Sequence, residues 1–329
     1  MKVLIIGGSN FVGRHIVEQA VERGHTVTMF NRGKSNPGLF PSIEKIEGDR
    51  DKDVALLLNR EWDSVIDTCG FFPRVVDRSV QLLKDHVKHY TFISTVSVYK
   101  DFLEPNKTEE AELATIEDTT VEEKTPETYG PLKVLCEDKV RNGFDHHLIV
   151  RPGFIVGPYD YSDRFTYWVD RMAKGDKVLA PGNREEYLQF IDARDLAEWL
   201  MDAIENQLVG TFNVTSEPNQ YTFEDVLEEC KRILNSDATL YWADDHQLEG
   251  KVQPFLELPF WVPKAWGEKG IFQINVEKVK KQGLKTRPLW ETIRDTGAWL
   301  KESKQQISEA GMDPEKEKEL ILELDGDVY

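Results

Sequence analysis

Short apolar runs and amphipathic stretches alternate along the first two thirds of the chain. Residues 2–6 (KVLII) form an apolar run of strand length, and residues 11–24 place apolar side chains near one face and end on a glycine, as helices do. This alternation predicts a parallel sheet that helices cover on both faces. Further apolar runs lie at residues 25–33, 42–49, 63–70, 89–99, 146–157 and 210–216, helical patterns at 53–60, 74–87, 128–143 and 163–175, and a strand leading into a helix at 187–206.

The last third of the chain has a different character. Helical patterns after residue 216 flank an aromatic, proline-rich segment at 255–267. The predicted fold class is α/β: a doubly wound, parallel-sheet domain with a smaller, mixed α/β C-terminal substrate domain. We assign residues 1–157 with about 186–216 to the first domain, and about 158–185 with 217–329 to the small domain and its charged tail.

Two segments interrupt this pattern. Residues 104–127 carry many acidic side chains and little periodicity, which predicts a solvated, partly mobile loop. The tail after Glu302 is highly charged and contains one short amphipathic stretch, EKELILEL, which predicts a surface helix. The pattern identifies no function for either segment.

Composition narrows the class of protein. The chain has 329 residues, 40% hydrophobic and 30% charged, so it can bury a sizeable core. No apolar stretch approaches the roughly 18 to 20 residues that cross a bilayer, and we expect a cytoplasmic protein with no membrane partner. The formal net charge of −18 argues against nucleic acid as the main partner. Three widely spaced cysteines predict reduced thiols. The adjacent His146 and His147 would point to opposite faces of a strand, which argues against a metal site.

The segment GGSNFVG connects the first predicted strand to the first predicted helix. In a dinucleotide-binding turn, one glycine forms the tight bend and another lets the helix pack close to the strand, and Gly7 and Gly13 match these places. The helix N-terminus would offer N–H groups and partial positive charge to phosphates. Asn10 stands where a further glycine is expected, and asparagine tolerates a left-handed backbone. The turn therefore predicts a Rossmann domain whose dinucleotide contacts Gly7, Ser9, Asn10, Phe11, Val12 and Gly13.

The ends of the next two strands bear on which dinucleotide fits. An acid after the second strand would bind the ribose 2′-hydroxyl of NAD, whereas an arginine favours the 2′-phosphate of NADP. The sequence has Asn31 and Arg32 there and no carboxylate, so the cofactor is NADP or NAD, with NADP favoured. Asp49, after the third strand, can accept a hydrogen bond from the adenine amino group.

Tyr129 and Lys133 lie four residues apart in a predicted helix and share one face. An unperturbed tyrosine has a pKa of about 10, too high for a general base near neutrality. A neighbouring ammonium stabilises the phenolate and lowers that pKa, and the same lysine can hold the nicotinamide ribose. The run FISTVSVY before this helix brings Ser94, Thr95 and Ser97 as hydroxyl donors for a substrate oxygen.

These motifs together resemble the extended short-chain dehydrogenases/reductases of the NAD-dependent epimerase/dehydratase family, and in particular an atypical branch of it. The resemblance rests on GGSNFVG, GDRD, DTCG, FISTVSVY, YGPLK, RPGFIVGP, QFIDARDLA and GTFNV in that order, and it covers about residues 1–216. It implies that Thr95, Tyr129 and Lys133 are catalytic. It also implies cofactor contacts from Asp49, Arg50, Thr68, Cys69, Gly70, Pro152 and Phe154.

Two departures from the family pattern bear on the reaction. Sugar 4,6-dehydratases carry an Asp-Glu pair after the catalytic threonine, and here Val96 and Ser97 stand in those places, which argues against dehydration. Many nucleotide-sugar enzymes place an arginine before their equivalent of QFIDARD, where it meets the substrate diphosphate, and here the corresponding residue is Leu188. A nucleotide sugar would then have to rely on Arg184 or Arg164.

The sequence therefore predicts an NAD(P)-dependent oxidoreductase that acts on a hydroxyl or carbonyl carbon of a sugar-like or other small substrate. One alternative is a nucleotide-sugar epimerase that holds its NAD tightly. Another is a non-catalytic relative that senses nucleotides or binds RNA. The resemblance also implies a homodimer as one assembly, paired through the helices around residues 74–87 and 129–142.

Overall fold

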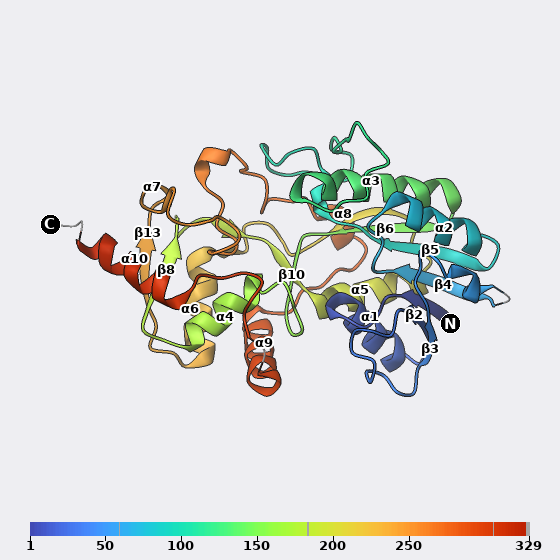
Figure 1. Cartoon of the computed structure of the whole chain (residues 1–329), viewed down its shortest axis with the longest axis horizontal. Coiled ribbons are helices and arrows are strands. Elements are labelled where there is room, and N and C mark those ends of the chain that lie inside the picture. Colours follow the sequence, from blue (N-terminus) through green and yellow to red (C-terminus); the bar gives the residue numbers. More distant parts are fainter. Residues whose placement is uncertain (59, 183, 305, 327–329) are drawn as a thin grey trace.

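A computed structural model describes residues 1–58, 60–182, 184–304 and 306–326 of the chain. Its main element is a seven-stranded sheet in the order β11-β6-β5-β4-β1-β2-β3, in which all neighbouring strands are parallel (Figure 1). The order reverses between β1 and β4, and ligands of such sheets bind outside the carboxyl ends at this switch point. The strands are β1 (Lys2–Ile6), β2 (Thr26–Asn31), β3 (Glu44–Glu47), β4 (Trp62–Asp67), β5 (Val87–Ile93), β6 (His147–Pro152) and β11 (Gly210–Val214).

Helices cover both faces of the sheet, which confirms the α/β fold predicted from the alternation. Helices α1 and α5 pack together on one face, and α2 and α3 on the other (Figure 1). The side chains of β1 divide with period two, because Val3 and Ile5 join the core under α1 and α5 while Leu4 and Ile6 join the core under α2 and α3. These helices are α1 (Phe11–Glu22), α2 (Pro73–Leu83), α3 (Pro126–Gly143) and α5 (Ala193–Glu205).

The apolar run at residues 146–157 forms two strands rather than the predicted one. After β6 the chain leaves the main sheet at Gly153 and continues as β7 (Phe154–Val156), which pairs in parallel with β10 (Phe190–Asp192). The predicted helix at residues 53–60 is shorter than expected and forms a 3₁₀ turn, η1 (Val54–Leu57).

The predicted strand at residues 89–99 also ends early, at Ile93, and leads into the 3₁₀ turn η2 (Val96–Val98). The physical reason is a local hydrogen bond, because the Thr95 side chain accepts from the Ser97 backbone N–H at 3.1 Å. Threonine side chains that bond nearby amides draw the backbone out of a sheet ladder.

A second group of elements lies beside the sheet. Strand β8 pairs in parallel with β13, and β9 pairs antiparallel with β12. The strands are β8 (Lys177–Pro181), β9 (Tyr187–Leu188), β12 (Tyr221–Thr222) and β13 (Thr239–Ala243). The helices are α4 (Arg164–Ala173), α6 (Phe223–Leu234), α7 (Asp245–Leu248), α8 (Glu277–Lys280), α9 (Leu289–Ser303), α10 (Pro314–Gly326) and the 3₁₀ turn η3 (Lys264–Trp266).

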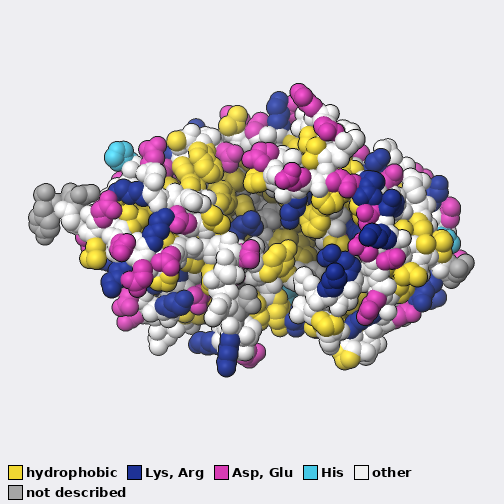
Figure 2. Space-filling view, viewed as in Figure 1, with side chains coloured by type: hydrophobic (Ala, Val, Ile, Leu, Met, Phe, Trp, Pro, Cys, Tyr) yellow, Lys and Arg dark blue, Asp and Glu magenta, His cyan; other side chains and the backbone are white. Residues whose placement is uncertain are grey.

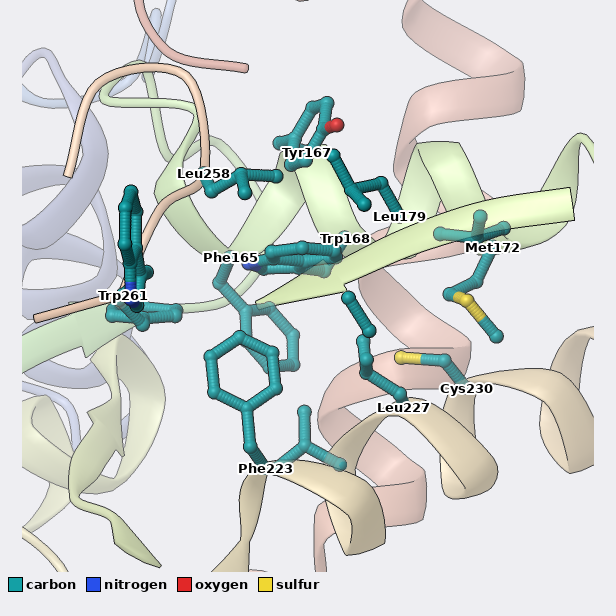
Figure 3. Close-up of a cluster of buried hydrophobic side chains, with 14 of the residues drawn as sticks. Phe165, Tyr167, Trp168, Met172, Leu179, Phe223, Leu227, Cys230, Leu258 and Trp261 are labelled. Atoms are coloured by element: carbon teal, nitrogen blue, oxygen red, sulfur yellow. The ribbon is translucent and has the colours of Figure 1, made fainter. Parts of the chain in front are cut away.

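The elements of this second group enclose their own hydrophobic core. The indole of Trp168 lies in the middle of it, between Phe165, Phe223 and Leu227 (Figure 3). Because its N–H donates to the Pro259 carbonyl at 2.9 Å, the ring is buried without an unpaired polar group. The chain thus packs around separate clusters of apolar side chains on the sheet and beside it.

The amphipathic stretch in the tail is a helix, as predicted, but it is part of the second core. In α10, Leu320, Ile321 and Leu324 are buried in that cluster. Glu317 is also buried, and its carboxylate accepts from the backbone N–H of Leu179 at 2.9 Å and from Arg171. The helix therefore covers the free edge of β8, which its charged composition concealed.

The acidic segment at residues 104–127 is tied to its surroundings. The Asn106 N–H donates to the Gln273 carbonyl, and Lys107 forms a β-bridge with Ile274. The Glu109 carboxylate accepts from the Asn213 N–H at 2.8 Å. The segment thus joins the C-terminal elements to the main sheet, although most of its acidic side chains are exposed as predicted.

In the part of the chain that the structure describes, no helix has both the length and the apolar composition to cross a membrane. Cys69, Cys136 and Cys230 are free thiols. The described residues contain no group of three or more His, Cys, Asp or Glu side chains arranged to hold a metal ion.

Candidate active site

The glycine turn between β1 and α1 has the tight geometry that its sequence predicts. Gly7 and Gly8 have φ angles of +107° and +85°, which favour glycine. A Cβ on Gly7 would lie 2.2 Å from the Thr68 hydroxyl oxygen, and one on Gly13 would lie 2.9 Å from the Gly8 backbone. The turn therefore brings the ends of β1 and β4 together at the switch point.

Asn10 does not adopt the left-handed backbone that its place in the turn suggested. Its φ and ψ are −127° and 148°, an extended conformation, and the left-handed positions are Gly7, Gly8 and Phe11. The Asn10 side chain accepts from Asn36 at 3.2 Å instead of capping α1. Amide groups in the first turn of α1 are thereby left to bind an anion.

The two residues at the end of β2, Asn31 and Arg32, have different surroundings. The Asn31 side chain donates to the Gly7 carbonyl and accepts from the Gly33 N–H, both at 2.9 Å, so it supports the turn. Arg32 is exposed. The carboxyl carbon of Glu47 lies 2.9 Å from the place of a Cβ on Gly33, so an acid does reach this turn from β3. The sequence interpretation missed Glu47, which only the register of β2 with β3 places opposite Asn31.

Arg50 forms a buried ion pair with Asp67 beneath the end of β4. Two guanidinium nitrogens each donate to a carboxylate oxygen at 2.7 Å, and the Tyr90 hydroxyl donates to the same carboxylate at 2.9 Å. Burial opposes ionisation of Asp67, but the Arg50 charge outweighs it and keeps the pKa of Asp67 below its usual value. The terminal nitrogens of Arg50 thus point into the fold. Its Nε is buried and has no hydrogen-bond partner among the described residues, so this nitrogen is left for the predicted cofactor contact.

Thr68, Cys69 and Gly70 continue from β4 along the same edge of the sheet. The Thr68 hydroxyl donates to the Ile6 carbonyl at 2.9 Å. Burial raises the pKa of the Cys69 thiol, so this thiol stays protonated. A Cβ on Gly70 would lie 2.5 Å from the Phe92 ring. These residues close the end of β4 against β1 and β5.

Thr95 and Tyr129 meet where η2 packs against α3. A Cβ on Gly130 would lie 2.0 Å from the Ser97 carbonyl oxygen, so glycine lets the helix that carries Tyr129 approach η2. Burial raises the pKa of Tyr129 above its usual value, while a hydrogen bond with Thr95 and the positive charge of Arg164 act to lower it. In this state the tyrosine is protonated at neutral pH.

Lys133 lies one helical turn beyond Tyr129, but its ammonium group is engaged elsewhere. It donates to the Gly70 carbonyl at 2.8 Å and to the Ile93 carbonyl at 2.6 Å, and the side chain is 3% exposed. Burial lowers the pKa of Lys133 to about 8. The expected lowering of the Tyr129 pKa below its usual value is therefore wrong for this state, because the lysine binds the strand ends below the tyrosine.

Ser94 is directed into the fold rather than toward a substrate. Its hydroxyl donates to the Glu137 carboxylate, which also binds Arg151 through two guanidinium nitrogens at 3.0 and 2.7 Å. The prediction of Ser94 as a substrate donor is wrong, because a buried carboxylate takes its proton. The hydroxyl of Ser97, in contrast, belongs to an exposed residue.

The segment between β7 and α4 covers the glycine turn. The Arg14 guanidinium lies 3.5 Å from the centre of the Tyr159 ring. The rings of Tyr161 and Phe11 pack edge to face, with their centres 6.4 Å apart. Between them, Asp160 is 1% exposed, and burial raises its pKa to about 6. The sequence interpretation missed these three residues, although the polar run PYDYSDR directly after a predicted strand was a usable signal.

Three further predicted residues are Phe154 and the two arginines considered for a diphosphate, Arg184 and Arg164. The Phe154 ring packs at the border of the second core, with its centre 5.8 Å from that of the Phe255 ring and 5.2 Å from that of the Phe272 ring. Arg184 lines a cavity of about 780 Å³ and is paired with Glu224 at 3.4 Å. Arg164 is exposed, and its charge acts on Tyr129. A recess near the middle of the face in Figure 2 separates the two ends of the molecule.

The sequence of the region that contains Thr95, Tyr129 and Lys133 is similar to known proteins. A model of the NAD dependent epimerase/dehydratase family matches residues 74–215. The chloroplast stem-loop binding protein of 41 kDa b from Arabidopsis thaliana is 24% identical over 255 residues, which cover 70% of this chain and 62% of that protein. UDP-N-acetyl-alpha-D-glucosaminuronate decarboxylase from Bacillus cytotoxicus is 24% identical over 324 residues, which cover 88% of this chain and 97% of the decarboxylase.

A solved structure shares the fold over nearly the whole length. UDP-glucuronic acid 4-epimerase from Bacillus cereus, in complex with NAD, is similar with a TM-score of 0.68 at 16% identity, covering 93% of this chain and 100% of the epimerase. At this identity the similarity shows a common architecture, with a nicotinamide dinucleotide bound in the known protein.

Proposed function

We propose that the chain, whose residues 74–215 match a model of the NAD dependent epimerase/dehydratase family, is an NAD(P)-dependent oxidoreductase. It is of the extended short-chain dehydrogenase/reductase type and acts on a carbon that bears a hydroxyl or carbonyl group, in a sugar-like or other small substrate. The observation that carries the proposal is the grouping of Thr95, Tyr129 and Lys133 where β4 and β5 end.

The residues at the switch point fit a dinucleotide. Glycine at residue 7 lets the backbone come close to Thr68, where a Cβ would clash, and the first turn of α1 offers amide groups to a diphosphate. A bound nicotinamide dinucleotide would accept or donate a hydride at the substrate carbon. The residues that would hold it are Gly7, Ser9, Asn10, Phe11, Val12 and Gly13 at the diphosphate, Asn31, Arg32, Asp49 and Arg50 at the adenosine, and Thr68, Cys69, Gly70, Pro152 and Phe154 along the strand ends.

The side chains near η2 supply the proton chemistry. The Tyr129 hydroxyl gives its proton to a carbonyl substrate, or takes one from a hydroxyl substrate, and Thr95 hydrogen-bonds the same oxygen. Lys133 holds positive charge close to the strand ends, where it favours the phenolate and reaches a ribose hydroxyl once it leaves a carbonyl. The substrate would lie between the Rossmann domain and the small domain.

The choice between NAD and NADP depends on the turn after β2. The exposed Arg32 favours a 2′-phosphate and hence NADP. The Glu47 carboxylate beside Gly33 opposes it, because it would repel a phosphate. We propose that Arg32 decides the preference, since its longer, exposed side chain can approach the phosphate while Glu47 is fixed by the strand register.

Two alternatives each have one supporting observation. A nucleotide-sugar epimerase with retained NAD is supported by Tyr159 and Tyr161, which lie over the glycine turn and would slow the release of a cofactor. An RNA-binding role is supported by the similarity to the chloroplast stem-loop binding protein, but the net charge of −18 would repel a polyanion.

The decisive experiment is to denature the purified protein and identify any released nucleotide by mass, with the Gly7→Ala variant as the empty control. NADP, or an empty protein that binds NADPH reversibly, is the result we expect. Stoichiometric NAD would favour the epimerase alternative, whose cofactor is regenerated in each cycle. A protein that contains no nucleotide and binds neither NADPH nor NADH would overturn the proposal.

A further inference from the structure

Residues 157–163, between β7 and α4, form a strap over the start of α1. The Arg14 guanidinium lies 3.5 Å from the centre of the Tyr159 ring. The ring centres of Tyr161 and Phe11, the first residue of α1, are 6.4 Å apart. Because the first turn of α1 offers the amide groups proposed for a diphosphate, the strap lies where a dinucleotide would enter and leave.

The backbone of the strap is strained in this closed position. Gly157, Tyr159 and Asp163 have φ angles of +118°, +70° and +57°, and such values are costly for residues that carry a side chain. The contacts of the strap therefore hold it closed against this strain, and the backbone relaxes when they are lost.

His15 of α1 binds the strap only when its ring is charged. This side chain is buried, its Nδ1 lies 3.0 Å from a Glu18 carboxylate oxygen, and its Nε2 lies 3.1 Å from the Pro158 carbonyl oxygen. Burial acts to raise the pKa of Glu18, but hydrogen bonds from His15 and Arg14 outweigh it and keep that pKa below its usual value. A carboxylate and a carbonyl only accept, so both ring nitrogens have to donate, and a neutral imidazole has only one N–H.

Asp160 in the strap also favours its protonated form. It is 1% exposed, its Oδ1 accepts from the Ser162 N–H at 2.8 Å, and its Oδ2 is buried with no partner among the described residues. Burial raises the pKa of Asp160 to about 6, because an unpaired charge is costlier to bury than a neutral acid. Since this pKa is above that of a carboxyl in water, the proton stabilises the closed strap at low pH, and that stability is lost as the pH rises through 6.

We propose that the strap is a pH-sensitive gate of the dinucleotide site, closed while His15 and Asp160 are protonated and opened by the loss of these protons. A neutral His15 leaves a bare ring nitrogen facing an acceptor, and an ionised Asp160 leaves a buried charge without a partner. In the open strap, water solvates both groups. The gate deepens the proposed function and rests on it, because it acts on a dinucleotide bound at the glycine turn.

Other titratable and charged groups surround both residues. His15 lines a cavity of about 450 Å³, together with Tyr159 of the strap and with charged side chains of α1, α5, α9 and the turn before α9, namely Glu18, Glu22, Arg194, Arg287, Asp295 and Glu302. The charges of Asp163 and Arg164 act on Asp160, and Asp160 acts on Tyr161. The test therefore substitutes His15 and Asp160 themselves, to separate their protons from those of their neighbours.

The first measurement is hydrogen exchange of the strap amides by mass spectrometry, on the protein without cofactor at pH 5.5 and pH 8. After correction for intrinsic rates, we expect protection to fall roughly tenfold between these pH values, with about fourfold of it from Asp160. Asp160→Asn stays neutral and should keep more protection at pH 8. His15→Gln has one amide nitrogen, which cannot reach both acceptors, and should lose protection already at pH 5.5. The double variant should show no pH dependence.

A second histidine provides the matched control. His25 follows the C-terminal end of α1 and binds Glu205 at 2.7 Å, so His25→Gln should keep the pH dependence of the wild type. Equal protection of the wild type at both pH values, or an unchanged pH dependence in the double variant, would refute the gate.

The second measurement is the dissociation rate of NADPH, by stopped-flow fluorescence at the same two pH values. We expect dissociation to be faster at pH 8 in the wild type and equal at both pH values in the double variant. A wild-type rate that does not change with pH would refute the gate and leave the proposed function standing, because NADPH still binds. A protein that binds neither NADPH nor NADH would overturn the proposed function and the gate together.

Discussion

The two halves of the candidate site are built from different parts of the polypeptide. The nucleotide half is backbone, because Gly7, Gly8 and Gly13 leave out side chains so that β1, α1 and β4 can meet. The proposed catalytic half consists of side chains, Thr95 and Tyr129 among them, and their directions depend on the groups that each one contacts. A substitution should therefore damage the first half by adding atoms and the second half by removing them.

The largest effect should come from removing one oxygen in the catalytic half. Tyr129→Phe leaves the packing of α3 intact but removes the hydroxyl group that we propose exchanges a proton with the substrate. We expect turnover to fall roughly 10²- to 10⁴-fold, the usual contribution of a positioned acid or base. NADPH affinity, measured by fluorescence titration, should stay within about twofold, because the backbone half is untouched. A matching loss of cofactor affinity would mean that the two halves are not separable.

The next largest effect should come from adding one methyl group to the nucleotide half. In Gly7→Ala the new Cβ would lie 2.2 Å from the Thr68 oxygen, at a φ of +107° that alanine rarely adopts. We expect a loss of about 3 kcal/mol of stability in urea unfolding and of at least a hundredfold in cofactor affinity.

A second glycine separates the two causes of that loss. Gly24 also has a positive φ, of +76°, but nothing lies within 4 Å of the place of its Cβ. Gly24→Ala should therefore cost only about 1 kcal/mol, the backbone part. Equal losses at Gly7 and Gly24 would show that the close approach to Thr68 contributes nothing.

The sequence was sufficient for the tight bend at Gly7 and for most of the sheet, because both depend on local patterns, but not for the backbone conformation of Asn10. The alternation of Val3 and Ile5 with Leu4 and Ile6 predicts a strand that is buried on both faces, and the structure has it so. The exceptions have local causes as well, because the Thr95 side chain ends the strand at Ile93. The terminal helix α10 was misjudged because the edge of β8 that it covers lies far away in sequence.

The residues of the catalytic half could be predicted from the sequence, but the directions of their side chains could not. The spacing of Tyr129 and Lys133 places both on one helix face, yet the lysine binds the carbonyls of Gly70 and Ile93. Ser94 lies next to Thr95 in sequence, but its hydroxyl turns toward Glu137. Each of these partners comes from another element, and a single sequence does not show which acceptor a long or small polar side chain will find.

A smaller effect should come from Asp160, in the segment that covers the glycine turn. Burial raises the pKa of this carboxyl from 3.8 to about 6, a difference of roughly 3 kcal/mol between its two protonation states. Because the folded pKa lies above the unfolded one, the neutral acid stabilises the fold below pH 3.8, and that stability is lost as the pH rises through 6. Asp160→Asn does not titrate, so it should gain about 2 kcal/mol over the wild type at pH 8 and nothing near pH 4.

Urea unfolding of both proteins at pH 4, 5, 6 and 8 gives this difference directly. The change should fall between pH 4 and 6, the interval between the two pKa values, and the difference should stay level above pH 6. A difference that is equal at all four pH values would show that Asp160 ionises in the folded protein as it does in water.

The smallest effect should come from Arg32, the one exposed cation at the end of β2 for which a role in the nucleotide half is proposed. Arg32→Ala removes a charge that would face the 2′-phosphate, and at an exposed site this is worth about 1 kcal/mol, or about fivefold in NADPH affinity. NADH affinity should change less than twofold, since NADH has no phosphate there. Lys34→Ala removes the same charge two residues further along the exposed turn and controls for long-range attraction. An equal loss of NADPH and NADH affinity in Arg32→Ala, or a loss equal to that in Lys34→Ala, would show that Arg32 acts only through long-range attraction. The Glu47 carboxylate beside Gly33 would then be the better guide to cofactor choice.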